Sequence, residues 1–204
     1  GSGLPINEPI GNLIADVGGG TSETALISMG GVVALEAVRV GSFDLDVAIQ
    51  NFIKKEFGVA IGERTAEEIK LTIGSASEYE GELRAEVRGR HISSGLPEVI
   101  VVSPSEIREA IEEPVSTMVD SVTSCLSKAP PEMAQDIIVQ GISLVGGGSL
   151  LKGFDKRLSE ETDVPVHIVP NALEAVVLGA GRCIESFESV RAMFMEDPNA
   201  RQRR

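Results

Sequence analysis

Two stretches of the chain combine a strand-like run, three consecutive glycines and a hydroxyl residue, namely LIADVGGGTS (residues 13–22) and ISLVGGGSLL (residues 142–151). Glycines directly after a strand allow positive φ angles and a close approach of the backbone to a ligand. Successive amide N–H groups in such turns form an anion-binding nest, which suits phosphate. A glycine-rich hairpin turn without a ligand is the alternative. The repetition of the triplet in matching contexts, about 130 residues apart, favours the ligand.

An acid precedes only the first triplet, and it is Asp16. An aspartate at the end of a strand, beside a phosphate nest, is well placed to hold Mg²⁺ directly or through water. The second triplet is preceded by Val145 instead. The residues therefore predict phosphates and metal at the first triplet and the other end of a nucleotide at the second.

The common nucleotide motifs are absent from the sequence. GxxxxGK[ST] fails because no lysine follows either triplet at the required place. GxGxxG fails at the first triplet because Glu23 occupies the position of the last glycine. Both a P-loop and a Rossmann dinucleotide site are therefore disfavoured.

Composition narrows the class of protein. The 204 residues are 42% hydrophobic and 24% charged, as in an ordinary globular protein that can bury a core. The net charge of −13 argues against nucleic acid, which needs a basic face. Two histidines exclude a histidine-cluster metal site, and the distant Cys125 and Cys183 fit reduced cytosolic thiols. The apolar runs are too short to span a bilayer, and the abrupt entry from the opening GSG into a strand indicates a fragment.

The first part of the chain predicts strands, then a helix, then a small insertion. Strands are expected at 13–15, 23–28 and 32–40, with Gly30-Gly31 as the turn of a hairpin. Helical periodicity from Asp44 ends at Gly58. A capping box of Thr65 and Glu68 predicts the start of a second helix. Strands at 82–90 and 98–102 complete an α+β insertion at residues 60–103, with a loop over 88–97 between them.

A serine N-cap, a proline and a glutamate in SPSE (103–106) predict a helix with a long apolar stripe, kinked at Pro114. A strand at 142–145, a helix from Ser149, a strand at 164–169 and a helix at 173–185 follow. Residues 186–195 could be helical, and 196–204 are expected to be a disordered tail. Strands that alternate with helices at both ends predict an α/β fold with a mixed sheet flanked by helices.

DVGGGT (16–21) resembles the second phosphate motif of the actin, Hsp70 and sugar-kinase superfamily, and LVGGGSLLKGF (144–154) resembles its adenosine motif. VGGGTSETALISMGG, GERTAEEIKLTIGSA, EVRGRHISSGLP and ALEAVVLGAGR are similar to the MreB family of bacterial actin homologues. This resemblance covers the chain from about Leu4 to Glu185. It implies an actin-like (ribonuclease H-like) ATPase fold, with subdomain IIA at 4–59 and 104–195 and the inserted subdomain IIB at 60–103.

The resemblance also implies a role for each site residue, with ATP and Mg²⁺ as the ligands. Asp16 matches the magnesium-associated aspartate, and Thr21 matches the residue that positions the attacking water. Glu67 and Lys70 match positions that reach the ribose and adenine, although an exposed i, i+3 ion pair is an equal alternative. In the first triplet, the amides of Gly18, Gly19 and Gly20 would donate to the β- and γ-phosphates. In the second, Gly146, Gly147 and Gly148 would lie against the adenosine.

The sequence departs from the family in VGSFDLD (40–46), where Ser42 and Phe43 replace a glycine and an acid, while Asp46 is retained. The loop beside the phosphates is therefore expected to be stiffer or less acidic. The family's first phosphate motif, catalytic glutamate and membrane-binding segment would lie in an absent N-terminal half. Hydrolysis above background is not expected without that half.

The family resemblance implies a cytoplasmic protein at the inner face of the cell membrane that polymerises with ATP and guides cell-wall synthesis. Membrane contact would occur only through the absent half, and an adaptor such as RodZ would dock on subdomain IIA. Two other classes stay open from the residues. One is a small-molecule kinase, for which no substrate-side base is found in this half; the other is an Hsp70-like chaperone module, which would continue into a substrate-binding domain.

Overall fold

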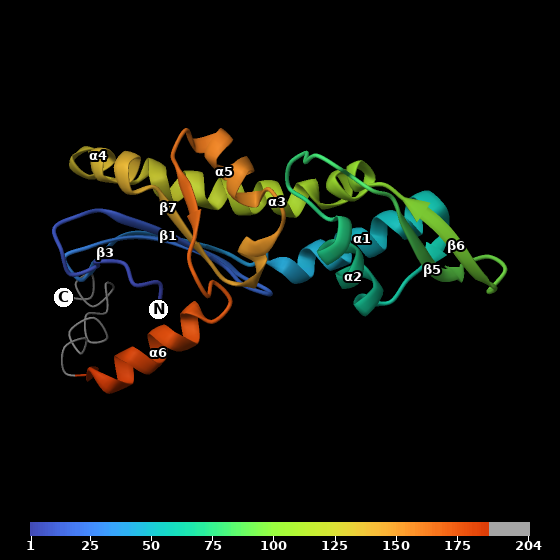
Figure 1. The fold of residues 1–204 in the computed structure, drawn as a ribbon, viewed down its shortest axis with the longest axis horizontal. Helices are drawn as coiled ribbons and strands as arrows, with labels where there is room; N and C mark the ends of the chain where they lie inside the picture. Colours follow the sequence, from blue (N-terminus) through green and yellow to red (C-terminus); the bar gives the residue numbers. More distant parts are fainter. Residues whose placement is uncertain (188–204) are drawn as a thin grey trace, which may run out of the picture.

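The computed structural model of the chain describes residues 1–187. They form an elongated molecule with a five-stranded sheet at one end and a three-stranded sheet at the other (Figure 1). The expected helix at 186–195 lies almost wholly, and the expected disordered tail at 196–204 wholly, outside the described residues. None of the helices in residues 1–187 is long and apolar enough to cross a membrane.

The larger sheet is mixed, as predicted. Its strands are β1 (Asn12–Val17), β2 (Ser22–Ser28), β3 (Gly31–Val38), β7 (Ile142–Val145) and β8 (Val166–Ile168). Their order is β3-β2-β1-β7-β8. β1 pairs antiparallel with β2 and parallel with β7, so the two glycine triplets leave the sheet at the same edge.

The β2–β3 hairpin turns on two residues, Met29 and Gly30, which have φ angles of 51° and 72°. Two positive φ angles are what a tight two-residue hairpin requires, since they match the twist of the flanking strands. Gly31 pairs with Ser28 and already belongs to β3. The prediction of a Gly30-Gly31 turn was therefore wrong by one residue.

The long helix α3 (Pro104–Ser127) lies against β2 and β3 on one face of the larger sheet (Figure 1). It runs on through Pro114 as one helix. Its predicted apolar stripe faces the core, with these residues buried: Ile107, Ile111, Val115, Met118 and Val122. The helices α4 (Pro131–Gln140) and α5 (Phe154–Thr162) lie on the same side, and α6 (Ala175–Glu185) lies on the other.

The smaller sheet consists of β4 (Val59–Ala60), β5 (Ala85–His91) and β6 (Pro97–Val102), all antiparallel. α1 (Ser42–Phe57) connects β3 of the larger sheet to β4, whereas α2 (Glu63–Ile73) connects β4 to β5 and packs against α1. The predicted insertion falls on this sheet and α2, and its division from the rest as a separate subdomain stays a prediction. β5 continues to His91, so the loop expected from residue 88 is shorter than predicted.

Three helices differ from their predictions. α2 begins at Glu63 after the N-cap Gly62, so Thr65 lies inside the helix and does not cap it. α4 was not predicted, although its first residue, Pro131, fits the first turn of a helix. Instead of one helix from Ser149, the chain has a 3₁₀ turn (Gly147–Leu150) followed by α5.

The capping box that begins α3 yields a stability prediction. Ser103 Oγ accepts a hydrogen bond from Glu106 N at 3.3 Å, and Glu106 Oε2 accepts one from Ser103 N at 2.7 Å. Ser103→Ala removes the first bond, together with the 2.6 Å bond that Ser103 Oγ donates to Glu106 Oε2. It should lower the free energy of unfolding by about 1 kcal/mol in urea denaturation. Thr117→Ala is the control, since the hydroxyl of this half-buried residue in the same helix donates back to Glu113 O and does not cap the helix. Equal losses in the two variants would contradict the capping role.

Candidate functional site

The two glycine triplets meet because β1 and β7 are parallel neighbours. Asp16 of β1 is in register with Val145 of β7, and the chain enters a triplet one or two residues after each. The carboxyl ends of adjacent parallel strands are where open α/β sheets bind ligands. The structure thus brings together two segments that are far apart in sequence.

The second triplet packs so closely on β1 that side chains would not fit. A Cβ on Gly146, whose φ is +85°, would lie 2.3 Å from Val17 O and 2.5 Å from Asp16 Oδ1. A Cβ on Gly148 would lie 2.5 Å from Val17 Cγ1. These glycines are needed for contact between the two triplets, and Asp16 lies at that contact.

The first triplet is held by the start of α1. Gly18 N donates to Thr21 O at 2.9 Å, and the Ser42 and Phe43 amides donate to the carbonyls of Gly18 and Gly19 at 3.0 and 2.8 Å. In the part of the chain that the structure describes, the Gly19 and Gly20 amides donate no hydrogen bond. Unpaired, partly exposed amides in a glycine turn are suited to bind an anion.

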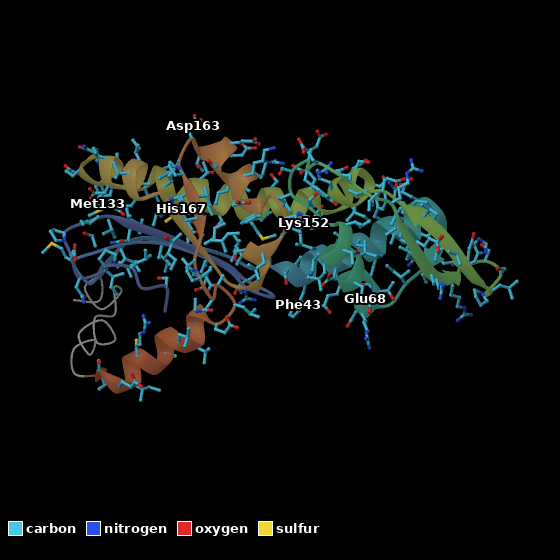
Figure 2. All side chains as sticks on the ribbon, viewed as in Figure 1. Phe43, Glu68, Met133, Lys152, Asp163 and His167 are labelled. Carbon is cyan, nitrogen blue, oxygen red and sulfur yellow. The ribbon has the colours of Figure 1, made fainter. Side chains whose placement is uncertain are left out.

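Phe43 lies directly over the first triplet. Its ring would be 2.7 Å from a Cβ on Gly19, and yet 65% of the residue is exposed. Figure 2 shows Phe43 where the large sheet meets α1. The expectation that this loop is stiffer or less acidic than in the family stays a prediction.

Asp16 is half-buried, and it faces Glu23 across the β1–β2 pairing. Burial raises the pKa of the Asp16 carboxyl, and the nearby Glu23 charge raises it further. Both effects disfavour the ionised form, and a cation would relieve both. Thr21 is exposed in the turn that follows the triplet. Within residues 1–187, no three acidic, histidine or cysteine side chains form a group that could hold a metal ion.

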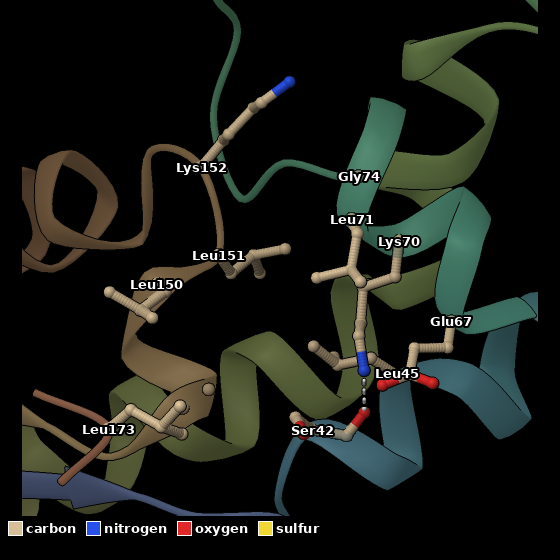
Figure 3. Close-up of a pocket in the computed structure, with 12 residues that line it drawn as sticks. Ser42, Leu45, Glu67, Lys70, Leu71, Gly74, Leu150, Leu151, Lys152 and Leu173 are labelled. Atoms are coloured by element: carbon tan, nitrogen blue, oxygen red, sulfur yellow. Dashed lines mark hydrogen bonds between the residues drawn. The ribbon is translucent and has the colours of Figure 1, made fainter.

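A pocket of about 410 Å³ opens between the second triplet and α2 (Figure 3). The second triplet contributes Gly147 and Gly148, and α2 contributes Glu67 and Lys70. Apart from Lys152, the other lining residues are apolar or small: Ser42, Leu45, Leu71, Gly74, Leu150, Leu151 and Leu173. A mostly apolar cavity with a few polar groups is the usual form of a small-molecule site.

The predicted alternative for Glu67 and Lys70, an exposed ion pair, is wrong. Lys70 is only 8% exposed, and its Nζ lies 2.9 Å from Asp46 Oδ2 and 3.1 Å from Ser42 O. Glu67 is exposed and borders the pocket beside it.

Sequence reasoning missed several lining residues. Lys152 borders the pocket, donates to Thr72 O at 2.9 Å and lies 5.0 Å from the centre of the Tyr79 ring. It stands within the LVGGGSLLKGF stretch, so its place beside the second triplet could have been found from the sequence. The contribution of Leu71 and Gly74 from α2 had no comparable signal, because it depends on how α2 packs.

Comparison with known proteins identifies the family. The family model for MreB/Mbl protein matches residues 1–192. The cell shape-determining protein MreB of Escherichia coli K12 is 42% identical over 188 residues, which is 92% of this chain and 54% of that protein. The cell shape-determining protein Mbl of Bacillus subtilis 168 is 38% identical over 190 residues, or 93% of this chain and 57% of that protein.

Solved structures agree in fold. MreB5 of Spiroplasma citri bound to AMPPNP matches with a TM-score of 0.87 and 34% identity, over 95% of this chain and 58% of that one. The ADP-bound MreB5 matches equally well, over 96% and 59%. The MamK double helical filament shares the fold alone, with a TM-score of 0.64 and 18% identity over 81% of this chain and 54% of that one.

The predicted actin-like fold and the predicted family resemblance are both confirmed. The chain spans about half the length of the curated relatives that it matches. Identities of 42% and 38% to an MreB and an Mbl do not separate these two branches. The match of the family model over nearly the whole chain, together with the sequence identity and the shared fold, shows that this chain belongs to the MreB/Mbl family.

Proposed function

We propose that this chain is the part of an actin-like, cell shape-determining protein that binds ATP with Mg²⁺. One observation carries the proposal: two glycine triplets meet at one edge of the sheet, and a pocket of about 410 Å³ opens beside them. The structures of MreB5 bound to AMPPNP and ADP support the choice of an adenine nucleotide.

The orientation of the nucleotide follows from the character of each end. The base and ribose would occupy the pocket, against the backbone of Gly147 and Gly148, with Glu67 within reach of a ribose hydroxyl. The phosphates would bind at the first triplet, where the Gly19 and Gly20 amides lack partners among the described residues. The apolar pocket would thus bind the base, and the amides of the first triplet would bind the charged phosphates.

The residues at the first triplet fit a magnesium ion. Asp16 would hold it, directly or through water, and phosphate and water oxygens would complete the shell that Mg²⁺ prefers. The bound ion would neutralise charge on the phosphates. Asp16 fits this role because burial and the Glu23 charge raise its pKa, and a nearby cation would stabilise its ionised form. Thr21 would help to orient a water near the phosphates.

Efficient hydrolysis would need the rest of the protein. An attacking water must be held from both sides of a cleft, and only Thr21 of this chain is proposed to act on it. The curated relatives extend well beyond the matched region. We therefore place the remaining catalytic groups in the part of the protein outside the matched region.

The cellular role proposed is that of a cytoskeletal filament protein that guides wall synthesis at the inner face of the membrane. Support comes from relatives named cell shape-determining proteins and from the fold shared with the filament-forming MamK. Membrane contact through the other half and a RodZ-like adaptor on residues 4–59 and 104–195 belong to the same proposal. Family membership favours this role over a kinase or a chaperone module.

The direct test is binding of nucleotide to the chain itself. At a concentration of about 100 times Kd, Mg-ATP should add roughly 2.7 kcal/mol of stability, which is about 5–10 °C in Tm for a domain of this size. Asp16→Ala should abolish most of the shift, and so should omission of Mg²⁺. An unchanged Tm at millimolar Mg-ATP would contradict the proposal for this chain.

A glycine substitution can test phosphate binding by the amides of the first triplet without disturbing the packing of the loop. A Cβ on Gly20 has no atom within 4 Å, so Gly20→Ala should fold normally. It should nevertheless weaken Mg-ATP binding in calorimetry, because the methyl group narrows the approach of the phosphates to the amides. Gly62→Ala is the control, since Gly62 has equal space but caps α2 away from the triplet. Unchanged affinity in Gly20→Ala would argue against phosphate binding there.

The raised pKa of Asp16 implies a stability cost at neutral pH. The carboxyl group stabilises the fold fully below its ordinary pKa of 3.8, and this contribution is lost as pH rises through the raised folded pKa. Asp16→Asn should therefore be more stable than the wild type at pH 7 without ligand, and the gap should narrow toward pH 4, measured by urea denaturation. Saturating Mg-ATP should reverse the order. A wild-type advantage at pH 7 without ligand would contradict this account.

The chain alone should release phosphate from Mg-ATP only at the background rate, because it holds one side of the cleft. A coupled phosphate-release assay with enzyme-free and Asp16→Ala controls measures this. Turnover above background that disappears in Asp16→Ala would show that the remaining catalytic groups lie within this chain.

A further inference from the structure

Lys70 of α2 is a buried cation at the wall of the pocket. Its ammonium group donates to Asp46 Oδ2 at 2.9 Å and to Ser42 O at 3.1 Å, the latter drawn in Figure 3. Both acceptors belong to the first two turns of α1. Two of the three N–H groups of the ammonium are thus fixed by the protein, which leaves one for any ligand.

The same turn of α1 holds the first triplet. Ser42 accepts from Lys70 through its carbonyl and donates to Gly18 O through its amide. The next amide, that of Phe43, donates to Gly19 O. A Cβ on Gly41 would lie 2.5 Å from Gly19 O, so the turn and the loop are in direct contact. Hydrogen bonds therefore connect α2, the α1 turn and the triplet without a gap.

The buried Lys70–Asp46 ion pair is not expected to add much to the stability of the fold. Burial of two charges costs desolvation that their attraction often fails to repay, and neutral replacements of such pairs are often tolerated. The second carboxylate oxygen, Asp46 Oδ1, is buried without a hydrogen-bond partner in the described structure. Burial also raises the pKa of Asp46, against the opposing effect of Lys70. A pair that is costly to bury but fixes a defined geometry points to a role in positioning.

We propose that Lys70 is a positioning residue for the phosphates: with Asp46 it fixes the first turn of α1 and, through Ser42 and Phe43, the backbone of the Gly18–Gly20 loop. This inference rests on the proposed function. It differs from the role implied by the family resemblance, in which Lys70 itself reaches the ribose and adenine. The adenosine side of the site, through α2, then determines the geometry at the phosphate side.

Lys70→Met tests the proposal because methionine has a similar length but no charge. Loss of a charge-assisted hydrogen bond to the turn should weaken ATP binding about tenfold, while the affinity for adenosine should be nearly unchanged in the same calorimetric titration. An equal loss for ATP and adenosine would overturn the proposal in favour of direct contact with the nucleoside. Unchanged affinity for both would also overturn it.

A matched control separates positioning from general stability. Arg157→Met removes another cation that bridges two helices, since Arg157 of α5 bonds to Glu112 of α3, and neither residue lines the pocket. It should lower Tm without altering the ratio of ATP to adenosine affinity. If Lys70→Met fails to fold because Asp46 is left unpaired, the double variant Lys70→Met with Asp46→Asn removes both charges. The double variant should show the same loss of the affinity ratio.

A second readout needs no nucleotide, so its failure is distinct from failure of the proposed function. In ¹⁵N-labelled protein, Lys70→Met should shift the amide resonances of Gly18–Gly20 and speed hydrogen exchange at Ser42 and Phe43. Arg157→Met should leave these amides as in the wild type. If Lys70→Met also leaves them unchanged, Lys70 does not position the loop, whether or not the chain binds ATP.

Discussion

The parallel pairing of β1 with β7 is the constraint on which the site depends. It places Asp16 opposite Val145 and sends both glycine triplets out of the same sheet edge. All four residues of β7 are buried, so its register is held by packing on both faces. A slip of one residue would turn these side chains over and would separate Asp16 from Gly146. The glycines that follow allow the contact, but the sheet determines where it occurs.

The site is assembled from the two glycine triplets, α1 and α2. Of these, α1 contacts both the first triplet and α2. Its first turn contacts the first triplet, its buried Asp46 holds α2, and its apolar face belongs to the core shared by both sheets. The pocket then lies between α2 and the second triplet. This overall plan agrees with membership of the MreB/Mbl family.

Much of this arrangement could be predicted from local patterns. The strands around both triplets, the capping box at Ser103 and the stop at Gly58 follow from alternation, caps and left-handed glycine. α4 was missed although its sequence carries a helix signal, since proline fits the first turn and Met133 and Ile137 are spaced i, i+4. The partner of Lys70 was also missed. Asp46 lies 24 residues away, and its contact depends on how two helices pack.

α1 is also the mechanical connection between the two ends of the molecule. Its 16 residues form a rod of about 24 Å that begins at the first triplet and ends at Gly58, directly before the smaller sheet. A rigid rod amplifies rotation at its base: a tilt of about 5° displaces the far end of a helix this long by about 2 Å. A small tilt of α1 at the first triplet would therefore move β4, β5 and β6 further than it moves the loop itself.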